Sequence, residues 1–236
     1  KRDIYERTTR GTRIYLATPR LRGLLALNFT VAAASAMVIV NTVVLVQGQL
    51  KLSQNATAMA LAAFGAGSLV ALSLPKLLER LADRSVMLAG AAMLVAGLAL
   101  GPLATMHLAS LLALWLCLGV GYSMVQTPSG RLLRRSSTPE DRPALFAAQF
   151  ALSHSCWLVT YPLAGWLGAK AGLDSSFLAL AALGAISACV AIRLWPHSDP
   201  VELEHSHQDL DPDHPQVGKA SPAGTRHSHA YVIDDE

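Results

Sequence analysis

One histidine lies in the middle of a long apolar stretch of this chain. His154 stands between Ala144 and Ala169, a run of 26 residues without Asp, Glu, Lys or Arg. A helix of that length measures about 39 Å at roughly 1.5 Å per residue, which is enough to span a bilayer with some tilt. An imidazole that faced only lipid would be unfavourable, so His154 should face protein or water. There it could contact a substrate, ligate a metal ion or carry a proton.

Polar residues accompany His154 along the same run and occupy two adjoining faces, since residues three, four or seven apart share a side of a helix. The pattern predicts the wall of a polar cavity, and the alternative is hydrogen bonding to a neighbouring helix. The candidate cavity residues on this run are Gln149, Ser153, His154, Trp157 and Tyr161, with Cys156 and Thr160 continuing the face of Gln149.

Two earlier apolar runs carry further candidates for the same cavity. Those on the first run lie about two helical turns apart and therefore share a face, where cavity lining and helix packing explain the pattern equally well. On the fourth run an i, i+4 pair stands beside Gly119 and Gly121, and these glycines indicate close approach of another helix. The candidates are Asn28, Ser35, Asn41 and Thr42 on the first run and Tyr122 and Gln126 on the fourth.

The last forty residues, 197–236, contain six of the eight histidines, interspersed with aspartates. Imidazole with carboxylate suits nickel, zinc, cobalt or copper, so this tail could hold a transient divalent metal, and no other cofactor is expected. The alternative is a polar, solubilising tail. Its polar, acidic composition predicts that it is disordered or only weakly ordered. The candidate metal ligands are His205, His207, His214, His227 and His229.

The elements that must position these residues are six apolar runs, each about as long as a bilayer core requires. With 52% hydrophobic and only 15% charged residues, the chain has the composition of an integral membrane protein. We therefore predict an all-α membrane protein with six transmembrane helices. The expected organisation is a linker segment at 1–22, a six-helix domain at 23–196 and the tail at 197–236. The apolar runs are 24–46, 56–75, 86–105, 108–128, 144–169 and 175–192.

Positive charge is concentrated at alternate ends of these runs. One set of ends carries seven Lys or Arg in residues 1–22, three between the second and third runs, and four in the loop at 131–142. The opposite set carries only Lys51 and Lys170. The positive-inside rule then predicts that both termini are cytoplasmic and that the protein lies in the cell membrane.

Other classes of protein find little support in the sequence. The arginines flank the apolar runs instead of forming one face, so nucleic-acid binding is not expected. No nucleophile elbow, phosphate loop or carboxylate pair is present, and we do not expect an enzyme. The three cysteines, Cys117, Cys156 and Cys189, all lie inside apolar runs, which is typical of small buried side chains.

The segment LERLADRSVM, between the second and third runs, contains the pair Asp83-Arg84, and the loop-to-helix unit that begins at Arg131 contains Pro162-Leu163-Ala164-Gly165. With six spans, these features resemble the C-terminal half of a major facilitator superfamily transporter. The Asp-Arg pair matches the Gly-x-x-x-Asp-Arg-x-Gly-Arg-type motif of that family, although Glu79 replaces the first glycine and no Gly-Arg pair follows Ser85. The resemblance implies a charge latch made by Glu79, Asp83 and Arg84, and the alternative is that these charges only define topology.

The resemblance implies a secondary-active permease that works by rocking two six-helix halves about a midplane site. Its partners would be the lipid bilayer, a small-molecule or ion substrate and an N-terminal six-helix half. We expect an exporter, with divalent metal ions such as nickel as one substrate class, because a nickel-resistance branch of these permeases also ends in a His-rich tail. The alternatives are a permease for a drug, sugar or organic ion with an incidental tail, and a six-span metal-sensing membrane scaffold.

Overall fold

Helix α2 (Pro19–Val43) lies at the centre of the fold and continues through a π-helical turn, η1 (Val44–Gln49). In its most apolar window 72% of the residues are buried, against 28% for the last helix, α8 (Leu173–Leu194). Such burial explains why the sequence of α2 is apolar on nearly all sides, with only small polar residues between. This computed structural model describes residues 4–72, 81–197, 202–207 and 225–230.

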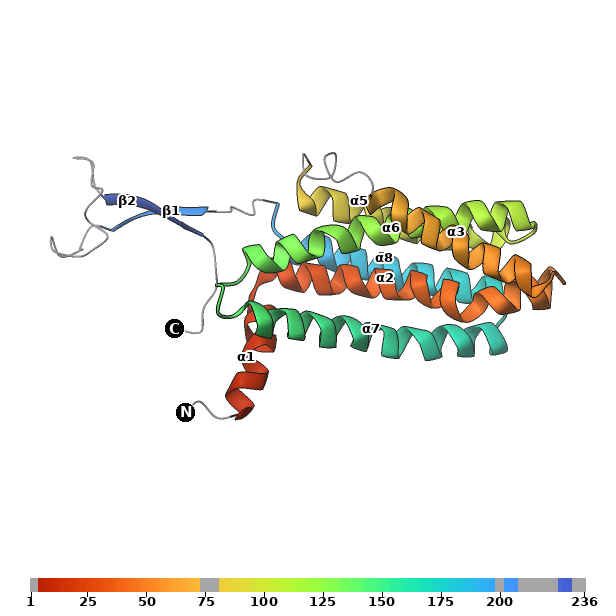
Figure 1. The fold of residues 1–236 in the computed structure, drawn as a ribbon, viewed down its shortest axis with the longest axis horizontal. Coiled ribbons are helices and arrows are strands. Elements are labelled where there is room, and N and C mark those ends of the chain that lie inside the picture. The colour runs from red at the N-terminus through yellow and green to blue at the C-terminus, as the bar shows by residue number, and fades with distance from the viewer. Residues whose placement is uncertain (1–3, 73–80, 198–201, 208–224, 231–236) are drawn as a thin grey trace.

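Five long helices surround or flank α2, and Figure 1 shows all six running side by side along the longest axis of the molecule. A shorter helix, α1, crosses one end of this bundle beside the start of α7 (Figure 1). The end of α8 and the connection between α6 and α7 lie at that same end. The remaining helices are α1 (Ile4–Ala17), α3 (Gln54–Leu72), α5 (Asp83–Ala104), α6 (Leu108–Arg135) and α7 (Arg142–Lys170).

Small hydroxyl side chains join α2 to its neighbours by donating to backbone carbonyl oxygens. Thr30 donates to the carbonyl of Gly184 in α8 at 3.0 Å. From the other side, Thr160 of α7 donates to the carbonyl of Ala32 at 3.2 Å. Hydrogen bonds between helices compensate for the weak hydrophobic driving force inside a bilayer, so these contacts specify which helices adjoin α2.

Helix α6 approaches two neighbours through glycines. A Cβ atom added at Gly119 would lie 2.0 Å from the carbonyl oxygen of Phe64 in α3, and one at Gly67 of α3 would lie 2.0 Å from that of Leu116. On another side of α6, a Cβ at Gly121 would lie 3.0 Å from the carbonyl oxygen of Gly90 in α5. The prediction that Gly119 and Gly121 mark close helix approach is therefore confirmed.

Each predicted apolar run overlaps one of the long helices, but several boundaries differ. Helix α6 continues through Pro128 to Arg135, so half of the predicted basic loop is helical and residues 136–141 connect α6 to α7. Pro143 lies at the start of α7, where its missing N–H would be unpaired in any case. Helix α5 passes through Pro102 and ends at Ala104, one residue before the end of the predicted third run.

Four helices in the described part of the chain are long and apolar enough to cross a membrane: α2 with η1, α5, α6 and α8. These confirm an α-helical membrane protein. Helix α7 is not among these four because polar residues interrupt its apolar sequence. Helix α3 is not among them either, and it ends at Leu72, where the described residues stop. The count of six spans and the domain boundaries stay predictions.

Two short segments of the tail pair as an antiparallel ladder, β1 (Glu202–His207) with β2 (Thr225–Ala230). The ladder sets His205 opposite His227 and Leu203 opposite His229. These two segments depart from the disordered or weakly ordered tail that composition predicts. Disorder elsewhere in 197–236 stays a prediction.

Candidate functional site

Three of the predicted cavity residues come together from three different helices. Helices α6 and α7 both pack on α2 but barely contact each other, which leaves α2 between them. There Ser35 of α2 lies within hydrogen-bonding reach of the Tyr161 hydroxyl of α7, and Tyr122 of α6 lies nearby. Tyr122 and Tyr161 are half-buried, and Tyr161 also lines an open groove along α7.

Asn28 lies on the same face of α2, two turns before Ser35. Its side chain is only 2% exposed, and neither amide atom has a hydrogen-bond partner among the described residues. Leaving a buried polar group unpaired costs about 1–3 kcal/mol. An amide in this condition is suited to bind water or a polar ligand, and its role as a cavity residue stays a prediction.

Two other candidates on α2 contribute to packing. Asn41 is buried and donates to the carbonyl of Ala164 in α7 at 3.3 Å. Thr42 is buried, donates to the carbonyl of Val38 and accepts a 2.9 Å hydrogen bond from the indole N–H of Trp115. For these residues the contacts favour the packing alternative over cavity lining.

His154 lies on the exposed face of α7, with its Nδ1 atom 2.7 Å from the carbonyl oxygen of Phe150 one turn earlier. Its ring centroid lies 3.8 Å from that of Phe150 and 4.7 Å from that of Trp157. The described contacts of His154 therefore stay within its own helix and do not bridge to a neighbour. An open groove of about 610 Å³ runs along this face, and its lining consists of Ala151, His154, Ser155, Trp157, Leu158, Tyr161 and Pro162.

The other predicted residues of α6 and α7 have less direct roles. Gln149 is half-buried and accepts a 2.5 Å hydrogen bond from the hydroxyl of Tyr15 in α1. Ser153 donates to the carbonyl of Phe150 in its own helix. Gln126 is half-buried one turn after Tyr122. Cys156 and Thr160 are buried, so their face packs inward while that of His154 looks outward.

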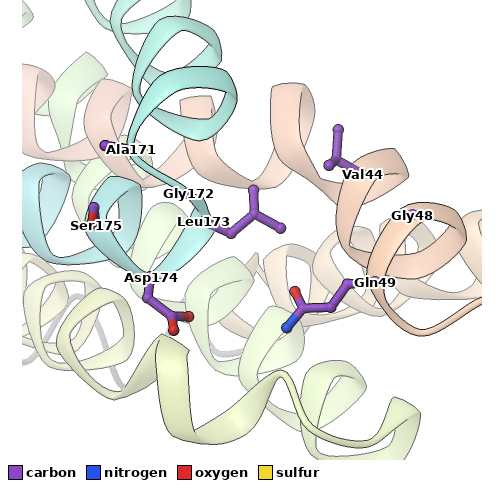
Figure 2. A pocket seen from close by; sticks show the side chains of 8 residues that line it. All are labelled: Val44, Gly48, Gln49, Ala171, Gly172, Leu173, Asp174 and Ser175. Carbon is purple, nitrogen blue, oxygen red and sulfur yellow. The ribbon is translucent and has the colours of Figure 1, made fainter.

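A second cavity, of about 640 Å³, lies at the opposite end of the bundle from α1 (Figure 2). It lies between η1 and the tight turn that joins α7 to α8. Gly172 in that turn has a φ of 87°, a left-handed conformation that glycine adopts without strain. The side chains of Gln49 and Asp174 reach toward the same space from opposite sides (Figure 2), and neither residue was predicted as a site.

The predicted latch residues make contacts inside the bundle. Asp83 forms an ion pair with Arg131 of α6, with Nη2 and Oδ1 2.6 Å apart. Arg84 donates through Nε to the carbonyl of Trp195 at 3.1 Å and through Nη2 to that of Ile192, and so caps the end of α8. Glu79 lies outside the described residues. These contacts join three helices at the end that carries α1, and a latching role stays a prediction.

Sequence reasoning missed the docking of α1 onto α7. Arg10 forms a two-point ion pair with Asp141, whose distances are 2.8 Å for Nε–Oδ1 and 3.1 Å for Nη2–Oδ2. A Cβ added at Gly11 would lie 2.2 Å from the carbonyl oxygen of Ala144, so the two backbones touch. Tyr15 is fully buried beside Gln149, and burial raises the pKa of its phenol well above the usual range. The sequence signal for α1 was the absence of proline from the residues before Pro19, which lets a helix form there.

The predicted metal ligands remain untested. His214 lies outside the described residues, and the other four histidines lie in β1 and β2. Where side chains are described, no three His, Cys, Asp or Glu residues gather into a group that could hold a metal ion.

Comparison with known proteins bears on the whole bundle. A family model described as the Major Facilitator Superfamily matches residues 24–226, a range that starts inside α2 and extends past the end of α8. No curated protein and no solved structure matches the chain.

Proposed function

The chain belongs to the major facilitator superfamily, and from this premise we propose that it forms the substrate-binding half of a secondary-active exporter of small cations. Membership places it among transporters that move small molecules across a lipid bilayer. In such proteins two six-helix halves rock about a midplane site. An N-terminal half would supply the opposite wall of the cavity.

The cluster of Ser35, Tyr122 and Tyr161 is the observation that carries this proposal. Ser35 and Tyr161 lie within hydrogen-bonding reach of each other and Tyr122 lies nearby, so three helices contribute to this polar cluster. Asn28 adds a buried amide with no partner among the described residues. Polar groups at membrane depth are unfavourable unless they pack against protein or line an aqueous cavity, so this arrangement favours a translocation path.

Transport by the full-length protein in reconstituted vesicles tests the assignment. Removing one hydrogen bond to a substrate costs about 0.5–1.5 kcal/mol, so Tyr161→Phe and Ser35→Ala should each slow transport about twofold to tenfold. The matched control is Ser110→Ala, because Ser110 is half-buried and its hydroxyl donates to the carbonyl of His107, just before its own helix. Equal transport by all three variants would contradict a substrate path at this cluster.

Divalent transition-metal ions are the first candidate substrates, and the tail supports them. The β1–β2 ladder pairs the position of His205 with that of His227, although twenty-one residues separate the two along the chain. Because every second residue of a strand lies on the same face, His207 and His229 occupy that face as well. Four histidine positions on one face would suit a cytoplasmic collector that delivers metal for export.

The tail hypothesis is tested by comparing the full chain with one that ends at residue 196. The full chain should bind nickel or zinc at micromolar concentration, and binding should weaken as the pH falls through about 6.5, where imidazole protonates. The shortened chain should lose this binding and confer less metal tolerance on cells. Unchanged tolerance, or binding that ignores pH, would favour a merely solubilising tail.

A permease for a drug, sugar or organic ion is the second candidate. The observation that favours it is the groove beside His154, where Ala151, Leu158 and Pro162 provide an apolar lining. Sites for organic molecules are typically apolar, with few polar groups. Competition of organic cations with metal ions for transport separates the two candidates.

A further inference from the structure

Helix α1 covers the beginning of the predicted cavity face of α7. It crosses the end of the bundle at which α7 starts (Figure 1) and packs mainly on that helix. Tyr15 of α1 is fully buried there, and its hydroxyl donates to Gln149 at 2.5 Å. Cys156 lies two turns further along the same face, within electrostatic reach of the phenol. Tyr15 therefore stands between this end of the bundle and the part of the face that carries Cys156.

A two-point ion pair holds α1 in this position. Arg10 pairs with Asp141 just before α7 begins, and the backbones of the two helices touch at Gly11. The side chains of Arg10 and Asp141 keep 26% and 14% of their surface exposed. Because water reaches both side chains, it can replace each partner of the pair, and the two helices can separate at this point.

The connection between α1 and α2 is a single extended residue. Thr18 has φ −86° and ψ 114°, a conformation that the following Pro19 favours. Beyond it α2 has an anchor of its own, because Arg20 is buried and donates to the hydroxyl of Ser136 at 2.8 Å, beside the end of α6. Residues at the ends of elements absorb the backbone rotation in hinges. Helix α1 can thus move about Thr18 while α2 stays in place.

A route along α7 from Tyr161 to this end of the bundle passes Tyr15. Gln149 lies twelve residues before Tyr161, about 18 Å along the helix at roughly 1.5 Å per residue. We propose that α1 is an autoinhibitory plug, which closes a water-filled route beside α7 when it is docked and opens that route when it swings away about Thr18. The inference rests on the proposed function, because a plug presupposes a route for substrate. The predicted topology makes this the cytoplasmic side.

Cys156 is a native reporter of the docked state. It is 7% exposed, whereas Cys117 of α6 and Cys189 of α8 are exposed. A trimethylammonium methanethiosulfonate reagent is permanently charged, so it reaches a thiol only through water. In lipid nanodiscs containing the full-length protein, Asp141→Asn and Arg10→Gln should each raise the rate at which this reagent modifies Cys156 about fivefold, because the rate follows the population of the open form. Mass spectrometry should show unchanged rates for Cys117 and Cys189.

Two controls identify release of the ion pair as the cause. Glu140 is exposed next to Asp141, so Glu140→Gln makes the same change of charge and should leave the Cys156 rate unaltered. The double variant with Arg10→Gln and Asp141→Asn should be no faster than either single variant, because all three proteins lack the same contact. Additive acceleration would assign the effect to loosening of the bundle and overturn the inference.

Substitution of Tyr15 tests whether its ring closes the route. Tyr15→Phe keeps the ring and should change the Cys156 rate less than about twofold, whereas Tyr15→Ala should raise it about fivefold. A Cys156 rate that Tyr15→Ala leaves unchanged would overturn the inference. Equal transport by the Ser35 and Tyr161 variants would instead reject the proposed substrate path, and Cys156 modification would still decide whether α1 closes a water-filled route.

Discussion

Replacing Gly119 by alanine should destabilise the contact between α3 and α6. The new Cβ would lie 2.0 Å from the carbonyl oxygen of Phe64, whereas ordinary contact begins at 3.4 Å, so the helices must separate locally by about 1.4 Å. Overpacking of this kind costs about 1–3 kcal/mol. The separation would also weaken the hydrogen bonds that join Ser68 to Gly119 and Ser123 to Ser68, each worth about 0.6 kcal/mol.

Alanine also favours a helix over glycine by about 1 kcal/mol, so the net loss for Gly119→Ala should be about 1–3 kcal/mol. The same reasoning applies to Gly67→Ala, whose Cβ would approach the carbonyl oxygen of Leu116. Thermal unfolding of the full-length protein in detergent measures the effect.

Each helix provides its own control. At Gly130 of α6 the nearest atom to an added Cβ is the end of the Arg134 side chain at 3.9 Å, and at Gly65 of α3 there is nothing within 4 Å. Gly130→Ala and Gly65→Ala should therefore be neutral or slightly stabilising. If Gly119→Ala unfolds at the same temperature as Gly130→Ala, the close contact between α3 and α6 is wrong.

Three further predictions concern α1 and the orientation of the bundle. Asp141→Asn should weaken the docking of α1 by about 1–3 kcal/mol, because it removes a charge-assisted pair with Arg10, and faster protease cleavage within α1 would reveal it. Since burial raises the pKa of Tyr15, docking should be fully stable below the unfolded value of 10.0 and weaken as the pH rises above it. Tyr15→Phe should remove this pH dependence of cleavage, and its persistence would exclude Tyr15 as the cause. A topology reporter at Asp83 should be cytoplasmic and one at Ser53 external, and a cytoplasmic Ser53 would reverse the predicted orientation.

The sequence determined the class of protein because membrane insertion depends on composition and length. Runs of about 20 apolar residues have few alternatives to a helix in a bilayer, where the backbone must satisfy its own hydrogen bonds. The glycines of the fourth run also indicated close packing correctly, since only a missing side chain lets two backbones touch. The basic loop was placed less well because Arg131 to Arg135 favour a helix as readily as a loop.

Tertiary structure decided which polar residues are used in packing between helices. Helical periodicity put Ser35 and Thr42 on one face of α2. Only the packing of the helices shows that the hydroxyl of Thr42 accepts a hydrogen bond from the indole N–H of Trp115, whereas Ser35 lies within hydrogen-bonding reach of Tyr161. Each span has several faces, and its neighbours determine which one remains open.

The docking of α1 likewise depends on residues far apart in sequence. Arg10 and Asp141 are 131 residues apart, and neither differs by type or spacing from the other loop charges. Composition and periodicity report what a segment can do by itself. A contact between two segments depends on how the whole bundle packs, so only the folded structure could reveal it.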